Sequence, residues 1–201
     1  MVKRADLKRD RFYKRAKEEG YRSRSAFKLL QIAHKFRMIK EGDVVVDLGA
    51  APGGWSQVAK ELVGAHGVVI SVDVQRIEKI EDVEIVLSDI TQEEATVTAI
   101  KALLKEREHV DSVISDASPK LSGNSAYDHF RSFELSKSAL NIASALLRRN
   151  GSFVAKLFQG ACYNTFYKDV AEKFGYARAY SPAASRKRSA EVYVIGKGFL
   201  F

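Results

Sequence analysis

Three charged residues occupy places where a protein core normally holds apolar side chains. Lys156 lies inside the apolar run 153–158, Glu191 opens the apolar run 191–195, and Asp116 ends the apolar run 110–115. Buried lysine and carboxylate side chains are rare unless they are paired. Each residue alone is compatible with a structural ion pair. Together, at the ends of strand-like runs, the three favour a catalytic site in which an amine and carboxylates move or hold a proton.

A glycine-rich segment, DLGAAPGGW at residues 47–55, offers a place for a ligand. Gly49 lets a ligand approach the backbone closely, and Gly53 allows a tight turn with free amide donors. An ordinary strand-to-helix turn is the alternative interpretation. The spacing differs from G-x-G-x-x-G, which counts against a dinucleotide pyrophosphate. Asp47 would repel a pyrophosphate but suits the cationic amino acid end of S-adenosylmethionine.

Two further acids follow the next strand-like runs. Asp73 ends one run and can accept hydrogen bonds from two ribose hydroxyls, although nicotinamide cofactors use the same device. Asp89 follows the next run and is placed to bind an adenine amino group. Together with Asp47, they predict S-adenosylmethionine as the cofactor. Trp55 is either a core anchor or a wall of this pocket.

Hydrophobic periodicity places these residues on an alternation of strands and helices. The expected strands are 43–49, 67–73, 83–88, 110–116, 152–158, 177–180 and 191–196. The expected helices are 5–19, 25–36, 53–62, one after a capping box of Thr91 and Glu94, 127–149 and 164–173. Asn150 and Gly151 are expected to stop the long helix at Arg149.

This alternation predicts an α/β fold, a single Rossmann-like domain with a mostly parallel sheet and helices on both faces. Ligands of such sheets bind beyond the carboxyl ends of the strands. The charged residues at or just past the expected strand ends are Asp47, Asp73, Asp89, Asp116 and Lys156. We therefore expect all five to gather at one edge.

The positive charge of the chain is concentrated in its first fifth. The chain has 201 residues and a formal charge of +8, and residues 1–40 contain 14 Lys and Arg against 4 Asp and Glu. We interpret residues 1–40 as a basic helical RNA-binding segment of the same domain, and 41–201 as the catalytic part. A solvated charged helix is the alternative. The phosphate-binding side chains are expected to be Lys3, Arg4, Lys8, Arg9, Arg11, Lys14, Arg15, Arg22 and Arg24, with Arg186, Lys187 and Arg188 across the pocket.

Several classes of protein are disfavoured. The longest apolar runs are too short to span a membrane, and the N-terminus lacks the apolar core of a signal peptide. Cys162 is the only cysteine and the four histidines are scattered, so no metal site is expected. We expect a monomeric cytoplasmic protein.

The sequence resembles the FtsJ/RrmJ family of S-adenosylmethionine-dependent ribose 2′-O-methyltransferases. The resemblance spans residues 21–193 and rests on five ordered segments: RSRSAFKL at 22–29, DLGAAPGGW at 47–55, SDASP at 115–119, VAKLF at 154–158, and SP at 181–182 through SAEVY at 189–193. It implies a class I methyltransferase domain whose seven-stranded sheet has an antiparallel last strand. The implied Lys-Asp-Lys-Glu tetrad is Lys28, Asp116, Lys156 and Glu191, with Lys156 as proton acceptor. The implied cofactor positions are Gly53, Trp55, Asp73, Asp89 and Asp116.

These residue types suit methyl transfer to a ribose. The nucleophile must lie in line with the departing sulfur, and a hydroxyl is a poor nucleophile until it loses its proton. A lysine acts as a base only as the neutral amine, which a second cation such as Lys28 would favour. Asp116 and Glu191 oppose that effect, so we expect them to orient the lysines.

The resemblance implies a uridine ribose of large-subunit (23S-type) ribosomal RNA, within a ribosomal particle, as the methyl acceptor. A tRNA anticodon loop is the alternative substrate. A recessed site requires an exposed or flipped-out nucleotide. A NAD-dependent oxidoreductase, a non-catalytic RNA-binding protein and a small-molecule methyltransferase are more distant alternatives.

Overall fold

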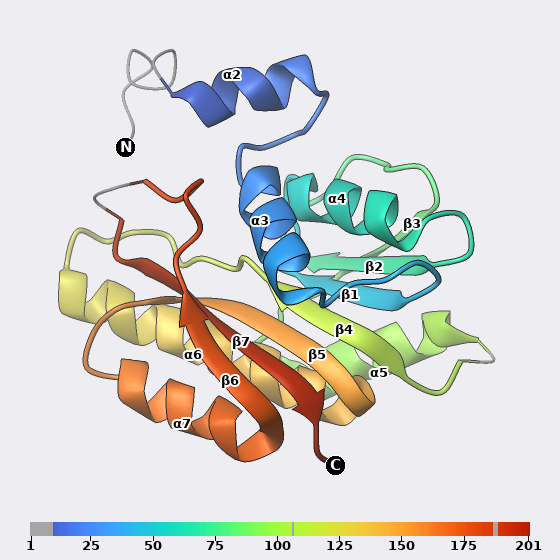
Figure 1. The fold of residues 1–201 in the computed structure, drawn as a ribbon. Helices are drawn as coiled ribbons and strands as arrows, with labels where there is room; N and C mark the ends of the chain where they lie inside the picture. The colour runs from blue at the N-terminus through green and yellow to red at the C-terminus, as the bar shows by residue number, and fades with distance from the viewer. Residues whose placement is uncertain (1–9, 106, 187–188) are drawn as a thin grey trace.

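A seven-stranded sheet runs through the middle of the molecule in the computed structural model (Figure 1). The structure describes residues 10–105, 107–186 and 189–201. The strand order is β3-β2-β1-β4-β5-β7-β6, and only β7 runs antiparallel to its neighbours. This is the predicted Rossmann-like arrangement, including the antiparallel last strand.

The strands are short, and most are buried on both faces. Their bounds are β1 Val44–Leu48, β2 Val68–Asp73, β3 Val83–Leu87, β4 Val110–Ser115, β5 Leu147–Phe158, β6 Phe174–Tyr180 and β7 Glu191–Phe199. The continuous β-branched and aliphatic runs of β1, β2 and β4 form central parallel strands because helices cover both of their faces.

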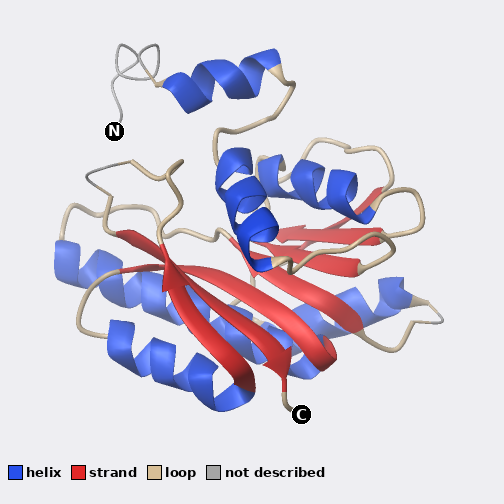
Figure 2. Cartoon of the chain, in the orientation of Figure 1, coloured by secondary structure: helices blue, strands red, loops and turns tan. Residues whose placement is uncertain are grey.

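Helices pack on both faces of the sheet (Figure 2). Their bounds are α2 Arg11–Glu18, α3 Ala26–Phe36, α4 Gly54–Val63, α5 Glu93–Leu104, α6 Ser125–Leu146 and α7 Tyr163–Lys173. One core cluster joins the sheet to α5, α6 and α7, and a second joins the opposite face to α3 and α4. Alternation along β1 divides its side chains, since Val44, Val46 and Leu48 face the first cluster and Val45 faces the second.

The long helix α6 differs from the prediction. It ends at Leu146 instead of Arg149, and β5 begins at Leu147 instead of Ser152. Leu147 pairs with Val110 of β4, and a register irregularity between Val110 and Ser112 accommodates the extra residues. Sheet pairing and burial of Leu147 thus override the helical pattern near the Asn150–Gly151 stop signal.

The ends of α5, β6 and β7 also differ from the predicted ones. Thr91 does not cap α5, whose N-cap is Gln92. The Thr91 hydroxyl instead donates to the Asp89 carboxylate at 2.8 Å. Strand β6 starts at Phe174 and β7 continues to Phe199, both beyond the predicted limits. Within the described ranges, none of the helices combines the length and apolar character that a membrane crossing requires.

Candidate active site

The antiparallel pairing of β5 with β7 places two long polar side chains side by side. Lys156 lies directly opposite Tyr193, and Phe158 lies opposite Glu191. Along β5, Ala155 and Leu157 face α6 and α7, so Lys156 points to the other face, toward α3. Residues two apart on a strand share a face, which puts Glu191 beside Tyr193. The strand register thus assembles these groups.

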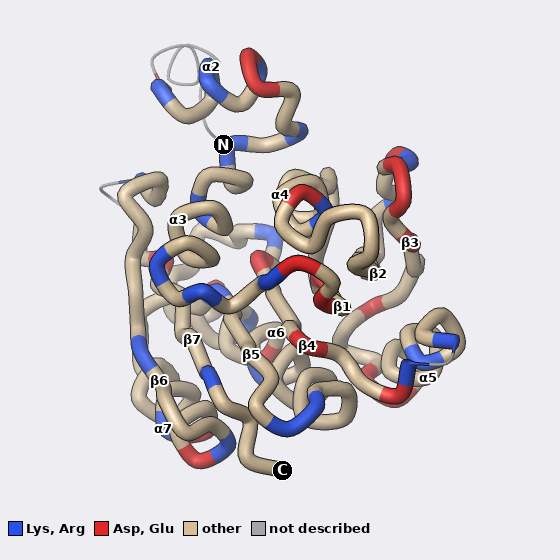
Figure 3. Tube along the Cα trace, turned by 45° about the vertical axis from the view of Figure 1, so that its right-hand side comes forward, with Lys and Arg blue, Asp and Glu red and all other residues tan. Residues whose placement is uncertain are grey.

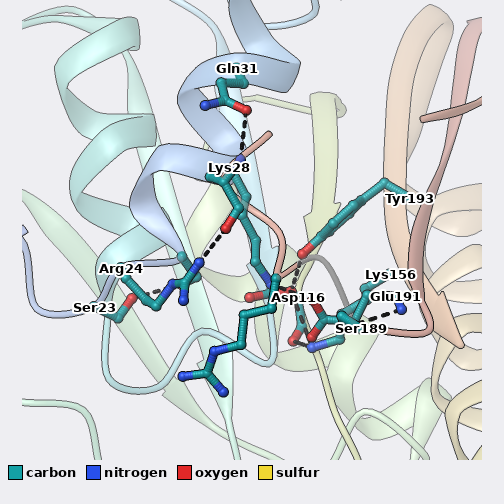
Figure 4. A network of polar contacts seen from close by, with 12 residues as sticks. Ser23, Arg24, Lys28, Gln31, Asp116, Lys156, Ser189, Glu191 and Tyr193 are labelled. Atoms are coloured by element: carbon teal, nitrogen blue, oxygen red, sulfur yellow. Dashed lines mark hydrogen bonds and ion pairs between the residues drawn. The ribbon is translucent and has the colours of Figure 1, made fainter. Parts of the chain in front are cut away.

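Two ion pairs join the four residues of the predicted tetrad (Figure 4). Nζ of Lys28, from α3, lies 2.8 Å from Oε2 of Glu191. Nζ of Lys156 lies 3.1 Å from Oδ1 of Asp116 and donates to the Asp116 carbonyl at 2.7 Å. Both lysines are buried, with 8% and 5% of their surface exposed. The structure therefore brings all four predicted residues together.

Tyr193 completes this network and was absent from the sequence prediction. Its hydroxyl donates to Oδ1 of Asp116 at 2.7 Å, and Nζ of Lys28 lies 5.6 Å from its ring centre. Burial raises the pKa of Tyr193 well above its usual range, so the hydroxyl keeps its proton and acts as a donor. Nothing in the apolar strand pattern distinguishes this tyrosine from a core residue.

Two neighbouring lysines stabilise the ionised form of the Asp116 carboxyl. Burial alone would raise the pKa of its carboxyl, but Lys156 and Lys28 lower it more, and the Tyr193 hydroxyl adds to their effect. The net pKa lies below the usual range. The Asp116 carboxylate can therefore accept from the Tyr193 hydroxyl and the Lys156 ammonium across the neutral pH range, while Lys28 acts on it through charge alone.

Two cavities meet at this network. The first, of about 580 Å³, is lined by residues that include Lys28, Glu191, Ser118, His129 and Phe158. We call it the substrate cavity. The second, of about 490 Å³, is lined by Asp116, Ser118 and residues of the strand ends. We call it the cofactor cavity. Ser118 borders both cavities, Lys28 and Glu191 line the first, and Asp116 lines the second. Lys156 is not among the lining residues of either cavity and lies behind Asp116, which it contacts.

The cofactor cavity contains four of the predicted cofactor residues. Gly49, Asp73, Asp89 and Asp116 all line it. Asp73 accepts from the amides of Ala51 at 2.9 Å and Gln75 at 2.7 Å, which fixes its carboxylate against the glycine-rich segment. A volume of this size, with carboxylates and apolar walls, fits S-adenosylmethionine.

Gly49 and Gly53 have backbone conformations that suit glycine. Gly49 has φ of +74°, and a Cβ there would lie 2.6 Å from Cα of Ala117. Gly53 has φ of +110°, and a Cβ there would lie 2.7 Å from Cδ1 of Ile80. Neither site tolerates a larger side chain without a shift of its neighbours. Gly49 in particular lets the segment 115–119 approach the glycine-rich segment.

Asp47, Gly53 and Trp55 were also predicted to hold the cofactor, but they are not among the residues that line the cofactor cavity. Asp47 is fully buried, and its Oδ2 accepts a hydrogen bond from Ser56 at 2.7 Å. Burial raises the pKa of its carboxyl to about 7. Trp55 is 2% exposed, stacks on Tyr193 with ring centres 5.7 Å apart, and donates to the carbonyl of Ser25 at 2.8 Å. Trp55 is thus a core anchor behind the network.

Lys and Arg residues recur along α2, α3 and the segment between them, and others lie on the C-terminal elements (Figure 3). Arg24 and Arg186 line the substrate cavity. Arg22 instead donates to the carbonyls of Pro52, Glu78 and Lys79, so it braces the glycine-rich segment. Arg11, Lys14 and Arg15 lie on α2 and are exposed. Lys3, Arg4, Lys8, Arg9, Lys187 and Arg188 lie outside the described residues.

Tyr21 and Tyr127 lie in different settings. Tyr21 packs edge-on against Phe27 and donates to Glu61 at 2.6 Å, so it is a packing residue. Tyr127 is 55% exposed and lines the cofactor cavity, not the substrate cavity. Among the residues with described positions, no three His, Cys, Asp or Glu side chains form a cluster suited to a metal ion.

Comparison with known proteins places this arrangement in a family. The sequence profile described as FtsJ-like methyltransferase matches residues 21–199. A "Ribosomal RNA large subunit methyltransferase E" of Methanocella arvoryzae is 54% identical over 193 residues, covering 96% of this chain and 73% of the relative. The protein of the same name from Archaeoglobus fulgidus is 47% identical and is covered over 97% of its length.

Solved structures show the same fold. A Plasmodium falciparum protein described as a ribosomal RNA methyltransferase superposes with a TM-score of 0.81 at 25% identity, covering 90% of this chain and 99% of that one. An S-adenosylmethionine-dependent O-methyltransferase from Thermotoga maritima superposes with a TM-score of 0.60 at 15% identity, covering 87% of this chain and 65% of that one. The second similarity concerns the fold alone.

Proposed function

The chain belongs to the FtsJ-like methyltransferase family, and we propose that it methylates a ribose 2′-hydroxyl of large-subunit ribosomal RNA with Lys156 as the general base. It is an S-adenosylmethionine-dependent methyltransferase with an α/β fold. The observation that carries the proposal is the Lys28, Asp116, Lys156 and Glu191 network, in which Lys28 and Glu191 line the substrate cavity, Asp116 lines the cofactor cavity and Lys156 is paired with Asp116.

S-adenosylmethionine supplies an electrophilic methyl group when it is bound. Gly49, Asp73 and Asp89 would hold it in the cofactor cavity. We propose that Gly53 shapes the loop and that Trp55 supports it from the core. Asp47 does not line the cavity and its carboxyl keeps a proton up to about pH 7, so we propose that it supports the start of α4 through its hydrogen bond with Ser56 instead of contacting the cofactor.

The hydrogen bonds of Lys156 define how it can accept a proton. Its Nζ has two protein partners, the carbonyl and the carboxylate of Asp116. In the neutral amine, the two N–H groups satisfy these acceptors and the lone pair takes the remaining tetrahedral position. A ribose hydroxyl at that position would give its proton to Nζ, which would make its oxygen nucleophilic toward the methyl group that S-adenosylmethionine would supply. Asp116 is thus the group that orients the base.

Lys28 and Glu191 act on the substrate side. Both line the substrate cavity, and their ion pair spans α3 and β7. Glu191 holds Lys28 in place, because a buried cation without a partner would be strongly disfavoured. We propose that this pair also borders the ribose of the target nucleotide.

The basic N-terminal segment, residues 1–40, supports RNA as the substrate. Arg24 from this segment and Arg186 from the β6–β7 connection line the substrate cavity. Such contacts hold phosphates and set register without reading sequence. We propose that the nucleotide is a uridine in an assembled ribosomal particle, and that the protein acts as a cytoplasmic monomer. The similarity to large-subunit rRNA methyltransferases favours this substrate over tRNA.

The proposed function is tested by supplying S-adenosylmethionine with a tritiated methyl group. The purified protein is incubated with free large-subunit ribosomal RNA, with large ribosomal particles and with tRNA, and 2′-O-methyl positions are mapped. We expect label at one ribose of the large-subunit RNA. Label on tRNA alone would contradict the substrate assignment, and label on a base would contradict the ribose assignment.

A further inference from the structure

One carboxylate, that of Asp10, contacts two arginines that line the substrate cavity and are far apart in the chain. Oδ2 of Asp10 accepts a hydrogen bond from Nη1 of Arg24, and Nε of Arg186 lies 3.9 Å from the same oxygen. Both arginines line the substrate cavity together with Lys28 and Glu191. The Asp10 side chain is 13% exposed and that of Arg186 is 46% exposed.

Local structure holds Asp10 in this position. It is the N-cap of α2, and its Oδ1 accepts from the amides of Phe12 at 3.1 Å and Tyr13 at 3.2 Å. The loop that carries Arg186 is fixed at Ala184, whose carbonyl accepts from Arg24 and whose amide donates to Oε1 of Gln31 in α3 at 3.1 Å. One oxygen of Asp10 therefore caps a helix, and the other neutralises guanidinium groups.

Two guanidinium groups that converge on one anion form the arrangement that proteins use for phosphate. Every ribose in RNA is flanked by phosphodiesters, so a nucleotide that enters the substrate cavity brings a phosphate to its mouth. Protein acceptors do not use all the hydrogen-bond donors of the Arg24 guanidinium, because its Nε has no partner among the described residues. A phosphate group is a stronger and larger acceptor than one carboxylate oxygen.

We propose that Arg24 and Arg186 form a subsite for a phosphodiester of the RNA, and that the Asp10 carboxylate occupies this subsite in the free protein and is displaced when RNA binds. This inference rests on the proposed function, since it assumes an RNA substrate. It assigns Asp10 the role of an internal competitor, which lowers the affinity for any RNA that cannot deliver a phosphate to this point.

The test uses Asp10→Asn in the full chain. Asparagine caps helices as well as aspartate does, so α2 keeps its N-cap while the negative charge is removed. Glu18→Gln is the matched control, because Glu18 is exposed on the same helix and its substitution changes the net charge equally. Binding to a large-subunit ribosomal RNA transcript is measured by fluorescence anisotropy, and KM and kcat are measured by methyl transfer.

We expect Asp10→Asn to bind the transcript about three- to tenfold more tightly than the wild type, with a lower KM for RNA and an unchanged kcat. Glu18→Gln should change affinity by less than about twofold. Equal affinities of the two variants, or weaker binding by Asp10→Asn, would overturn the inference and leave the proposed function standing. A wild-type protein that binds no RNA would overturn both.

Discussion

The buried carboxylate of Asp47 makes the stability of the fold depend on pH in a direction that can be tested. Asp47 is fully buried in β1, and it has one hydrogen-bond donor, the hydroxyl of Ser56. Its other oxygen, Oδ1, has no partner among the described residues. Burial raises the pKa from 3.8 to about 7; Ser56 lowers it partly, and the charges of Asp116 and Asp73 raise it.

The direction in which stability changes with pH follows from the number of protons that the folded and unfolded states bind. Between pH 3.8 and about 7, the folded protein keeps a proton on Asp47 that the unfolded chain has lost. The folded state binds more protons in this window, so its stability falls as pH rises and levels off above about 7. At about 1.4 kcal/mol per pKa unit, the interval from pH 5 to 7 corresponds to a loss of about 3 kcal/mol.

Asp47→Asn removes this titration, because the amide resembles the protonated acid in shape and charge. We expect the variant to gain about 3 kcal/mol relative to the wild type between pH 5 and pH 8.5, as measured by urea unfolding. Asp82→Asn is the control, since its side chain is 74% exposed. The reasoning would be refuted if Asp47→Asn and the wild type differed in stability by the same amount at pH 5 and at pH 8.5.

Two further substitutions test the cavity and the network. Gly49→Ala would place a Cβ 2.6 Å from Cα of Ala117, at a residue with a positive φ. We therefore expect the Kd for S-adenosylmethionine, measured by calorimetry, to rise at least about tenfold. An unchanged Kd would contradict the proposed role of this close approach. Tyr193→Phe deletes the 2.7 Å hydrogen bond to Asp116 but keeps the ring stacked on Trp55. We expect a stability loss of about 1–2 kcal/mol in denaturant unfolding and a kcat lowered about tenfold; a kcat equal to that of the wild type would show that Tyr193 serves folding alone.

Strong local signals made most of the fold predictable. The apolar runs of β1, β2 and β4 have one stable solution, a central parallel strand, and the structure confirms them. The end of α6 was not predictable in the same way. Leu147 fits the helical pattern as well as the strand, and pairing with Val110 decides between them. Thr91 likewise had a capping spacing, but Asp89 competes for its hydroxyl.

Asp116, Lys156 and Glu191 could be singled out because their charges stand out against strand-like runs, whereas Lys28 lies in the helix α3 and was predicted only from the family resemblance. The contribution of Tyr193 could not be predicted, because a tyrosine is ordinary in a buried strand and its hydroxyl partner, Asp116, is 77 residues away. The position of Asp47 outside the cavity lining depends on strand alternation, which turns its side chain to the α4 face with Val45. The contact between Asp10 and Arg24 depends on Asp10 being the N-cap of α2, which sequence spacing does not reveal.

The central claim concerns the amine of Lys156, and single-turnover methyl transfer tests it most directly. Lys156→Ala and Lys156→Arg are mixed with labelled S-adenosylmethionine and large-subunit ribosomal RNA, and cofactor binding is measured in parallel. We predict that both variants bind the cofactor and fail to methylate, because alanine lacks a base and arginine does not give up its proton. Methyl transfer by either variant at a near wild-type rate would contradict the assignment of Lys156 as the base.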